Sequence, residues 1–354
     1  MSGRTRWSAT FRVLTLAAVV AACSPAIEPS SGVPGSTSTS PAPAPSTAPS
    51  ASPATSQAAV AHFTFTRDPV VTTALAGTKD IYINPGALFE SGGTLHLFPN
   101  SFTNWPGRML VPHLTSTDAG ATWTLDTSFK PLDTSTFKLA DPGIDISTGF
   151  IADDGTWVML YESVSALDPW VIARATAPGP SGPWTIGTTP ILTAGAPGSW
   201  DAGGVEWPSV VRVGNRWAML YEGVDKPGGA GTGAIGVAFS DDGKTWTKQP
   251  QPVLMADEPW ELKSIGRPRV VHTPAGYVML YTGLDITQRG LATSPDGLTW
   301  KSLPGPSIDR SDFPITGGSW DSALLAGSGQ LVYFLEIGDG VTFTKDFRGT
   351  LPWP

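Results

Sequence analysis

The sequence predicts an all-β protein: a five-bladed β-propeller made of four-stranded antiparallel blades. Two series of residues carry this prediction, because both recur every 60 residues. The tripeptide Met-Leu-Tyr begins at residues 159, 219 and 279, and a Trp followed by an acidic residue begins at residues 200, 260 and 320. A fixed period shared by two motifs indicates an array of one structural unit. The stretch from residue 62 to residue 354 is long enough for close to five such units.

The third unit shows how one blade is built. Apolar segments at Val205–Arg212, Trp217–Tyr221 and Gly233–Ser240 are separated by turn residues, and a short fourth strand is expected after Trp246. The fourth unit repeats this order of segments. Short apolar runs bounded by Gly and Asp turns, without helical periodicity, predict antiparallel strands. Four-stranded units that repeat radially are the blades of a propeller.

The last unit, from Ser322 to Pro354, contains fewer strand-like segments than the others. We therefore expect the N-terminal stretch His62–Leu75 to supply its outer strand, which would close the ring and remove exposed sheet edges. Turns with the sequences STDAGATW, SDDGKTW and SPDGLTW precede the fourth strands and resemble the Asp-box of sialidases. Their carboxylates, at Asp118, Asp242 and Asp296, are interpreted as structural, since an Asp side chain can bond the backbone N–H groups of a turn.

The first 23 residues predict a signal peptide. A basic start is followed by the apolar run Val13–Ala22, which is too short to span a bilayer. The ending Val-Ala-Ala-Cys resembles a bacterial lipobox, which implies lipidation of Cys23, the only cysteine of the chain. An ordinary signal peptide with an incidental cysteine is the alternative. We expect an extracytoplasmic protein that is attached to the bacterial cell membrane through this lipid alone.

Residues 24–60 are rich in Ser, Pro, Ala and Thr, which predicts a flexible tether. Residues 61–354 form the expected propeller domain. The net charge of −8 and the absence of a basic stripe argue against a nucleic-acid partner. The four histidines show no metal-ligand spacing, so no metal or cofactor is predicted. The domain is expected to act as a monomer.

Chemistry in a propeller is expected where the first strand of each blade enters the central channel. Four carboxylates lie at such entries and are the candidate catalytic residues: Glu206, Asp145, Asp141 and Asp80. Glycosidic cleavage needs two carboxyl groups, one as acid and one as base or nucleophile. Glu206 stands out because Gly266 lies 60 residues later, so the repeat does not demand a carboxylate there.

Carboxylates that keep the 60-residue step are more typical of architecture than of function. This series comprises Asp141, Asp201, Glu261 and Asp321. Asp141 has the strongest claim to a functional role among them because Pro142 follows it, whereas Asp145 stands outside the series.

Several segments resemble motifs of one superfamily. Val205–Val210 resembles the third-blade segment that carries the general acid in glycoside hydrolase families 43 and 32, and Asp141-Pro142 and Asn84-Pro85-Gly86 resemble first- and second-blade motifs. The chain is therefore similar, over residues 62–354, to the five-bladed propeller enzymes. These are families 43 and 62 (arabinanases, xylosidases, arabinofuranosidases), 32 and 68 (invertase, levansucrase) and 130 (mannoside phosphorylases). The resemblance implies a carbohydrate substrate and Glu206 as general acid.

One position departs from families 43 and 32. Asn84 stands where their first-blade carboxylate is expected, and an amide cannot act as base or nucleophile. An Asn-Pro pair is reminiscent of family 130, in which phosphate attacks and Arg or Lys residues hold it. The predicted substrate-binding residues are Asn84, Arg267, Arg269, and the sugar-stacking aromatics Trp207 and Trp105.

The leading hypothesis is a cell-surface glycoside hydrolase that cleaves an extracellular oligo- or polysaccharide by two-carboxylate catalysis. A non-catalytic carbohydrate-binding lipoprotein is the first alternative, motivated by Asn84. A glycoside phosphorylase is the second. A sialidase-like enzyme is the third, suggested by the Asp-box turns, but sialidases have six blades.

Overall fold

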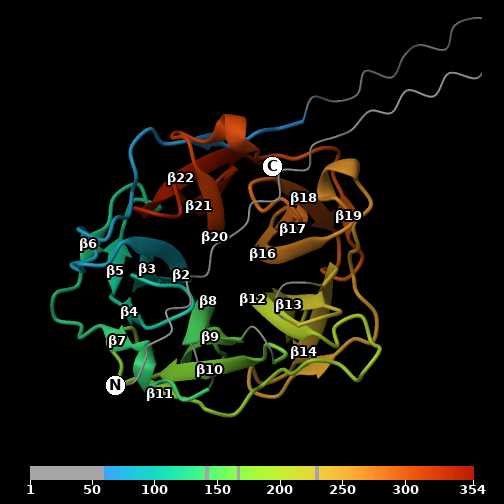
Figure 1. Cartoon of the computed structure of the whole chain (residues 1–354), viewed down its shortest axis with the longest axis horizontal. Helices are drawn as coiled ribbons and strands as arrows, with labels where there is room; N and C mark the ends of the chain where they lie inside the picture. The colour runs from blue at the N-terminus through green and yellow to red at the C-terminus, as the bar shows by residue number, and fades with distance from the viewer. Residues whose placement is uncertain (1–59, 140–142, 166–167, 228–230) are drawn as a thin grey trace, which may run out of the picture. The chain divides into compact units, whose positions relative to one another are not determined.

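The computed structural model describes residues 60–354 except 140–142, 166–167 and 228–230, so the signal peptide, the tether and Cys23 lie outside the described residues. The described part contains 22 strands, three short 3-10 helices and no α-helix. No helix in it is long and apolar enough to cross a membrane. The strands form five sheets arranged around a central channel, which confirms the predicted five-bladed propeller (Figure 1). Five blades argue against the sialidase-like alternative.

Three blades contain four strands each, paired in chain order from the channel outward. The predicted strands of the third blade are confirmed, and Met-Leu-Tyr lies in the second strand of each of these blades. The strands are β8 (Gly143–Ile151), β9 (Trp157–Val164), β10 (Ile172–Ala177) and β11 (Thr185–Ile186); β12 (Gly204–Val213), β13 (Arg216–Val224), β14 (Gly233–Ser240) and β15 (Thr247–Lys248); and β16 (Ile265–Thr273), β17 (Gly276–Gly283), β18 (Arg289–Ser294) and β19 (Lys301–Ser302).

The first blade has the same four positions, but its two outer positions are each divided between two short strands. One end of β3 pairs with β5 and then β6, and the other end pairs with β4 and then β7. The strands are β2 (Tyr82–Ser91), β3 (Thr94–Phe102), β4 (Met109–Val111), β5 (Leu114–Ser116), β6 (Thr124–Leu125) and β7 (Leu132–Asp133).

The fifth blade closes the ring with strands from both ends of the chain. It contains β20 (Gly318–Gly327), β21 (Gln330–Gly338) and β22 (Thr344–Pro352), and β1 (Thr64–Phe65) pairs with β22 on its outer side. The expectation that His62–Leu75 supplies the outer strand is therefore confirmed.

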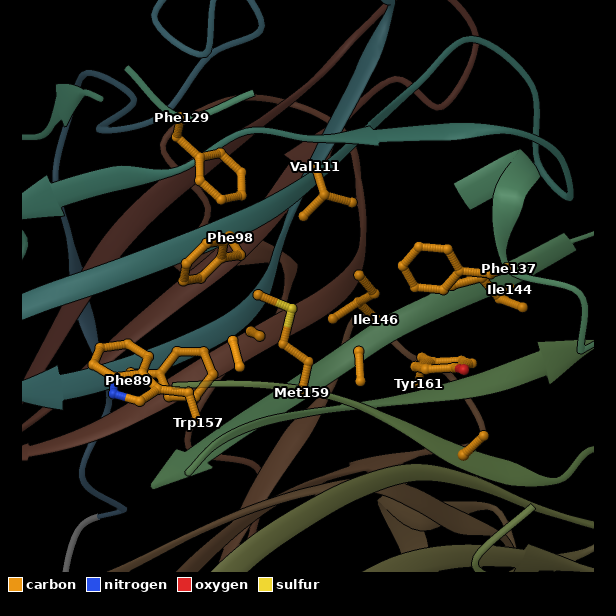
Figure 2. Close-up of a cluster of buried hydrophobic side chains, with 14 residues drawn as sticks. Phe89, Phe98, Val111, Phe129, Phe137, Ile144, Ile146, Trp157, Met159 and Tyr161 are labelled. Carbon is orange, nitrogen blue, oxygen red and sulfur yellow. The ribbon is translucent and has the colours of Figure 1, made fainter. Parts of the chain in front are cut away.

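Aromatic side chains fill the space between neighbouring blades. Between the first and second blades, the rings of Phe89 and Trp157 lie 4.7 Å apart, and Met159 of the first Met-Leu-Tyr packs into the same cluster (Figure 2). Burial of such side chains stabilises each sheet against the next by about 1.5–3 kcal/mol per residue. The repeated triplet is thus part of the scaffold.

The Asp-box carboxylates bind their own turns, as predicted. Asp242 Oδ1 accepts the backbone N–H groups of Lys244 and Thr245. Asp118 accepts both the hydroxyl and the backbone N–H of Thr122, and these bonds lower the pKa of Asp118 to about 2. A carboxylate held in this way is a structural group, not a proton donor or acceptor for a substrate.

Candidate functional site

Every inner strand carries a β-bulge near its beginning, and we call this end of the channel the mouth. Bulges are over-represented next to active sites because they re-aim side chains. Six of the predicted site residues lie within the inner strands, at or beside the bulges, and not before the strands as expected: Asn84, Asp145, Glu206, Trp207, Arg267 and Arg269. The bulges fall between Asn84 and Ala87, Ile146 and Thr148, Glu206 and Ser209, Gly266 and Arg269, and Ser319 and Ser322.

Two of the bulges force residues other than glycine into the left-handed region. The φ angle is 43° at Trp207 and 50° at Arg267. Each such residue costs about 1–3 kcal/mol and persists only where the surrounding structure imposes it, which is typical of binding and catalytic sites. Pro208 and Pro268 follow these residues and lack the N–H group that a regular strand would need.

Glu206 is a buried carboxyl group at the mouth. Its side chain is 3% exposed, and Oε1 has no hydrogen-bond partner among the described residues. In the register of β12 and β13, Glu206 lies directly opposite Glu222. Burial, and then the charge of Glu222, raise the pKa of Glu206 well above its ordinary value. A carboxyl group that stays protonated near neutral pH is suited to act as a general acid.

Asp145 is the second buried carboxyl group and is held by amides of the first blade. Asn100 Nδ2 lies 2.8 Å from Asp145 Oδ1 and also 2.8 Å from Asn84 Oδ1. Burial and the nearby charge of Asp321 raise the pKa of Asp145 to about 7, although Arg267 opposes this shift. Asn84 thus takes part in orienting Asp145 through Asn100, which an amide can do although it cannot act as a base.

Arg267 is the half-buried cation of the mouth. Its guanidinium carbon lies 3.9 Å from the centre of the Trp207 ring, and Nη1 donates to the carbonyl of Trp320 at 3.1 Å. Its charge lowers the pKa of both Asp145 and Glu206, so it faces both carboxyl groups. This position suits contact with a polar or anionic substrate group.

Arg269 is occupied by protein partners. Its Nη2 lies 2.5 Å from Asp321 Oδ1, and both side chains are 3% exposed. Its Nε donates to the carbonyl of Ser322. We therefore interpret Arg269 as half of a buried ion pair between the fourth and fifth blades, and Arg267 as the arginine available to a ligand.

A row of tryptophans leads from the surface to Arg267. Trp105 is 42% exposed, and its ring centre lies 6.2 Å from that of Trp170. The ring centre of Trp170 lies 5.3 Å from that of Trp207, and the guanidinium of Arg267 lies over the Trp207 ring. The indole of Trp105 also bonds the carboxyl group of Asp145 and lowers its pKa. Trp170 and Trp207 are buried, so Trp105 is the ring of this row that is exposed and suited to stacking on a sugar.

Asp80, another predicted carboxylate, binds hydroxyl groups of its own blade. Asp80 is half-buried and accepts the hydroxyls of Ser101 at 3.0 Å and Thr103 at 2.8 Å, both in or next to β3 of its own blade. Asp141 lies outside the described residues.

Two members of the 60-residue acidic series are architectural, as predicted. Tyr221 and Tyr281, the tyrosines of Met-Leu-Tyr, donate to Asp201 at 3.3 Å and to Glu261 at 2.6 Å. Lys248 also bonds Asp201, at 2.6 Å.

Asp321 is architectural too, as predicted, since it binds Arg269 of the neighbouring blade, but its place in the fold is not equivalent to that of Asp201 and Glu261. The register-equivalent residues Glu206, Gly266 and Ser319 are spaced by 60 and then 53 residues (266 − 206 and 319 − 266). The shorter fifth unit therefore brings Trp320-Asp321 into the β20 bulge, where Asp321 pairs with Arg269. Its 60-residue spacing from Glu261 is coincidental.

Sequence reasoning missed three carboxylates on the second strands. Glu162 accepts the hydroxyl of Ser147 at 2.7 Å, Glu222 accepts the N–H of Arg267 at 2.9 Å, and Glu336 accepts the N–H of Asp321 at 3.2 Å. Each thus binds a bulge. For Glu162 and Glu222 the available signal was their position directly after Met-Leu-Tyr, where the next blade has Thr282; no such signal marks Glu336.

Replacing Asp201 with Ala is expected to destabilise the fold by about 1–3 kcal/mol, because Tyr221 and Lys248 lose a buried partner. Urea unfolding would measure this loss, and kcat/KM of the folded protein should stay at the wild-type value. A large fall in kcat/KM at unchanged stability would instead assign Asp201 to the functional site.

Comparisons with known proteins support the fold. No family model matches the chain. A curated relative, the 1,2-beta-oligomannan phosphorylase of Thermoanaerobacter sp. (strain X514), is 28% identical over 138 residues, which are 35% of this chain and 47% of the relative. The chain thus matches about half the length of this relative.

Solved structures match over most of the chain. A family 117 glycoside hydrolase from Zobellia galactanivorans is 16% identical with a TM-score of 0.58, covering 82% of this chain and 90% of its own. The GH43_1 enzyme from Xanthomonas citri, complexed with xylotriose, is 13% identical with a TM-score of 0.60 and the same coverage. The chain therefore shares the five-bladed β-propeller fold of these glycoside hydrolases, as its sequence motifs predict for family 43.

Proposed function

We propose that this chain is a carbohydrate-active enzyme that cleaves a glycosidic bond, with Glu206 as the general acid. The observation that carries the proposal is the state of Glu206, which is buried at the mouth and opposite a second carboxylate, with one oxygen unpartnered among the described residues. Such a group keeps its proton to higher pH than an exposed carboxyl group does, and it has an oxygen free to bond a glycosidic oxygen.

Asp145 is the proposed partner of Glu206. Its pKa of about 7 allows it to accept a proton from water near neutral pH, and Asn100 and Trp105 hold its orientation. Arg267 and the tryptophan row would bind the sugar. Asp80 and Asp141 are the alternative candidates for the base.

Phosphorolysis is the second candidate reaction. In this reaction phosphate attacks the sugar directly, so no carboxylate base is required, and Asn84 at the first-blade position is compatible with it. Arg267 supplies a cation that faces both carboxyl groups, and the partial sequence relative is named as a phosphorylase. We favour hydrolysis because the pKa of Asp145 suits a base.

The setting of the reaction is part of the proposal. A signal peptide at residues 1–23, a lipid at Cys23 and a tether at residues 24–60 would hold the propeller, as a monomer, outside the bacterial cell membrane. The substrate would then be an extracellular oligo- or polysaccharide.

The test is to incubate the full chain with aryl furanosides, fructans and mannosides, with and without inorganic phosphate. Release of free sugar without phosphate supports hydrolysis, and a phosphate-dependent sugar phosphate supports phosphorolysis. Binding of a glycan without turnover of any substrate would overturn the enzyme proposal in favour of a carbohydrate-binding lipoprotein.

A further inference from the structure

We propose that Glu222 is the positioning residue of this site: its carboxylate holds the backbone of Arg267 and keeps the proton on Glu206. This inference rests on the proposed function of Glu206 as an acid. It assigns to Glu222 a role that links the acid of the third blade to the arginine of the fourth blade.

The first observation is the geometry of the two glutamates. Glu206 in β12 and Glu222 in β13 are directly opposite in the strand register, so their side chains leave the same face of the sheet. Two carboxyl groups at such a position do not ionise together at low cost, because each negative charge opposes the other. One of them therefore holds a proton near neutral pH.

The second observation decides which one. Burial raises the pKa of Glu222, but the charge of Arg267, the backbone N–H of Arg267 that Glu222 Oε2 accepts at 2.9 Å, and the charge of Arg269 all oppose this rise. Glu206 Oε1 has no donor among the described residues. Hydrogen bonds and cations stabilise a carboxylate, so the charge resides on Glu222 and the proton on Glu206.

The third observation is that glycines of the third and fourth blades leave room for this carboxylate. A Cβ atom at Gly266 would lie 2.0 Å from Glu222 Oε2, and one at Gly233 would lie 3.0 Å from Oε1. The side chain of Glu222 thus occupies the space that any larger residue at position 266 would fill. This gives a physical reason for glycine at the position that is equivalent to Glu206 in the fourth blade.

The fourth observation is that a chain of contacts links Glu222 to Glu206 through Arg267, across the third and fourth blades. Glu222 holds the N–H of Arg267, which has a φ of 50°, and the guanidinium of Arg267 lies over Trp207, the neighbour of Glu206 in the chain. Loss of the Glu222 carboxylate would therefore release the backbone of Arg267 and also remove a negative charge facing the acid. The ionisable groups at the mouth end of the strands packed against β12 are Asp145 on β8, Glu162 on β9, Glu222 on β13, and Arg267 and Arg269 on β16.

The Glu222→Gln variant is expected to move the alkaline limb of the pH profile of kcat/KM to lower pH by about one pH unit or more. Two carboxyl groups that titrate as a coupled pair shift each other's pKa by about this amount. A general acid works only while it is protonated, so turnover falls as pH rises through its pKa. Glu222 raises the pKa of Glu206, and removing its charge lowers that pKa. Glu222→Asp keeps the charge and should return the limb toward the wild-type position.

Glu162→Gln is the matched control. Glu162 follows the preceding Met-Leu-Tyr, lies opposite Asp145 and binds Ser147. Its loss should leave the alkaline limb in place, although it alters the surroundings of Asp145. Equal shifts of the alkaline limb in Glu162→Gln and Glu222→Gln would show a general loss of charge at the mouth and overturn the specific role of Glu222.

A titration independent of turnover separates this inference from the proposed function. Carbon-13 NMR of the glutamate carboxyl carbons, assigned with Glu206→Gln and Glu222→Gln, should show Glu206 titrating above Glu222 in the wild-type protein. Glu206 should titrate at lower pH in Glu222→Gln. The reverse order in the wild type would overturn the inference even if Glu222→Gln failed to fold. If the protein turned over none of the substrates, the proposed function would be wrong. The titration would still decide whether Glu222 keeps the proton on Glu206.

Discussion

Glu206→Gln is expected to lower kcat/KM by about 10²–10⁴-fold, which is the usual contribution of a general acid or base. The amide keeps the shape of the side chain but has no acidic proton to give to a leaving oxygen. Binding of the intact glycan should be nearly unchanged, because Arg267 and the tryptophan row remain. Steady-state kinetics on an activated and an unactivated substrate would test this expectation. The loss should be smaller for an aryl glycoside, whose leaving group needs less protonation.

The matched control is Glu90→Gln. Glu90 is an exposed residue of β2. It lines the part of the channel below the bulges, which is a cavity of about 320 Å³. The same change of charge at this position should leave kcat/KM at the wild-type value. Wild-type activity in Glu206→Gln would exclude Glu206 as the acid and direct attention to Asp145 or Asp80.

Arg269→Met is expected to destabilise the propeller by about 3–5 kcal/mol, the usual cost of removing one partner of a buried ion pair. The substitution would leave Asp321 as a buried charge that is only 2% exposed, with its Oδ2 already unpartnered among the described residues. It would also remove the bond to the carbonyl of Ser322. Because these contacts join the fourth and fifth blades, urea unfolding should shift to a lower midpoint.

Two variants sharpen this experiment. Lys244→Met removes an exposed ion pair with Asp154 and should leave the urea midpoint unchanged. The double variant Arg269→Met with Asp321→Leu should recover most of the lost stability, because an apolar pair of similar volume can replace a buried ion pair. An unchanged midpoint in Arg269→Met alone would show that the pair contributes little to blade docking.

The fold could be predicted because its causes repeat along the chain. Met-Leu-Tyr recurs since the second strand of each middle blade packs in the same way, and Asp201 and Glu261 recur since each binds the tyrosine of that triplet. Glu206 could be singled out for the opposite reason: the equivalent position of the next blade is Gly266, so the scaffold does not require it.

The rest of the site depends on backbone register, which residue patterns do not reveal. Asp321 is not the positional equivalent of Glu261, because the 60-residue spacing continues by coincidence through a fifth unit whose bulge comes seven residues early (60 − 53). Glu222 was overlooked because its functional contact is with the backbone of Arg267 in another blade. Contacts of this kind follow from how the sheets pack together, not from the alternation of residues within a single strand.

The five bulges also have a consequence for how this architecture could acquire new chemistry. Each of the five inner strands has a polar residue at or beside its bulge, and these residues are an amide, two acids, an arginine and one member of an ion pair. Each bulge therefore provides a position for a polar side chain, and the residues at the five positions need not resemble one another. A substitution at one of these positions changes the functional groups at the mouth. It leaves intact the hydrophobic packing between the blades, which lies farther out. Chemistry and scaffold can thus diversify at separate positions of the same strand.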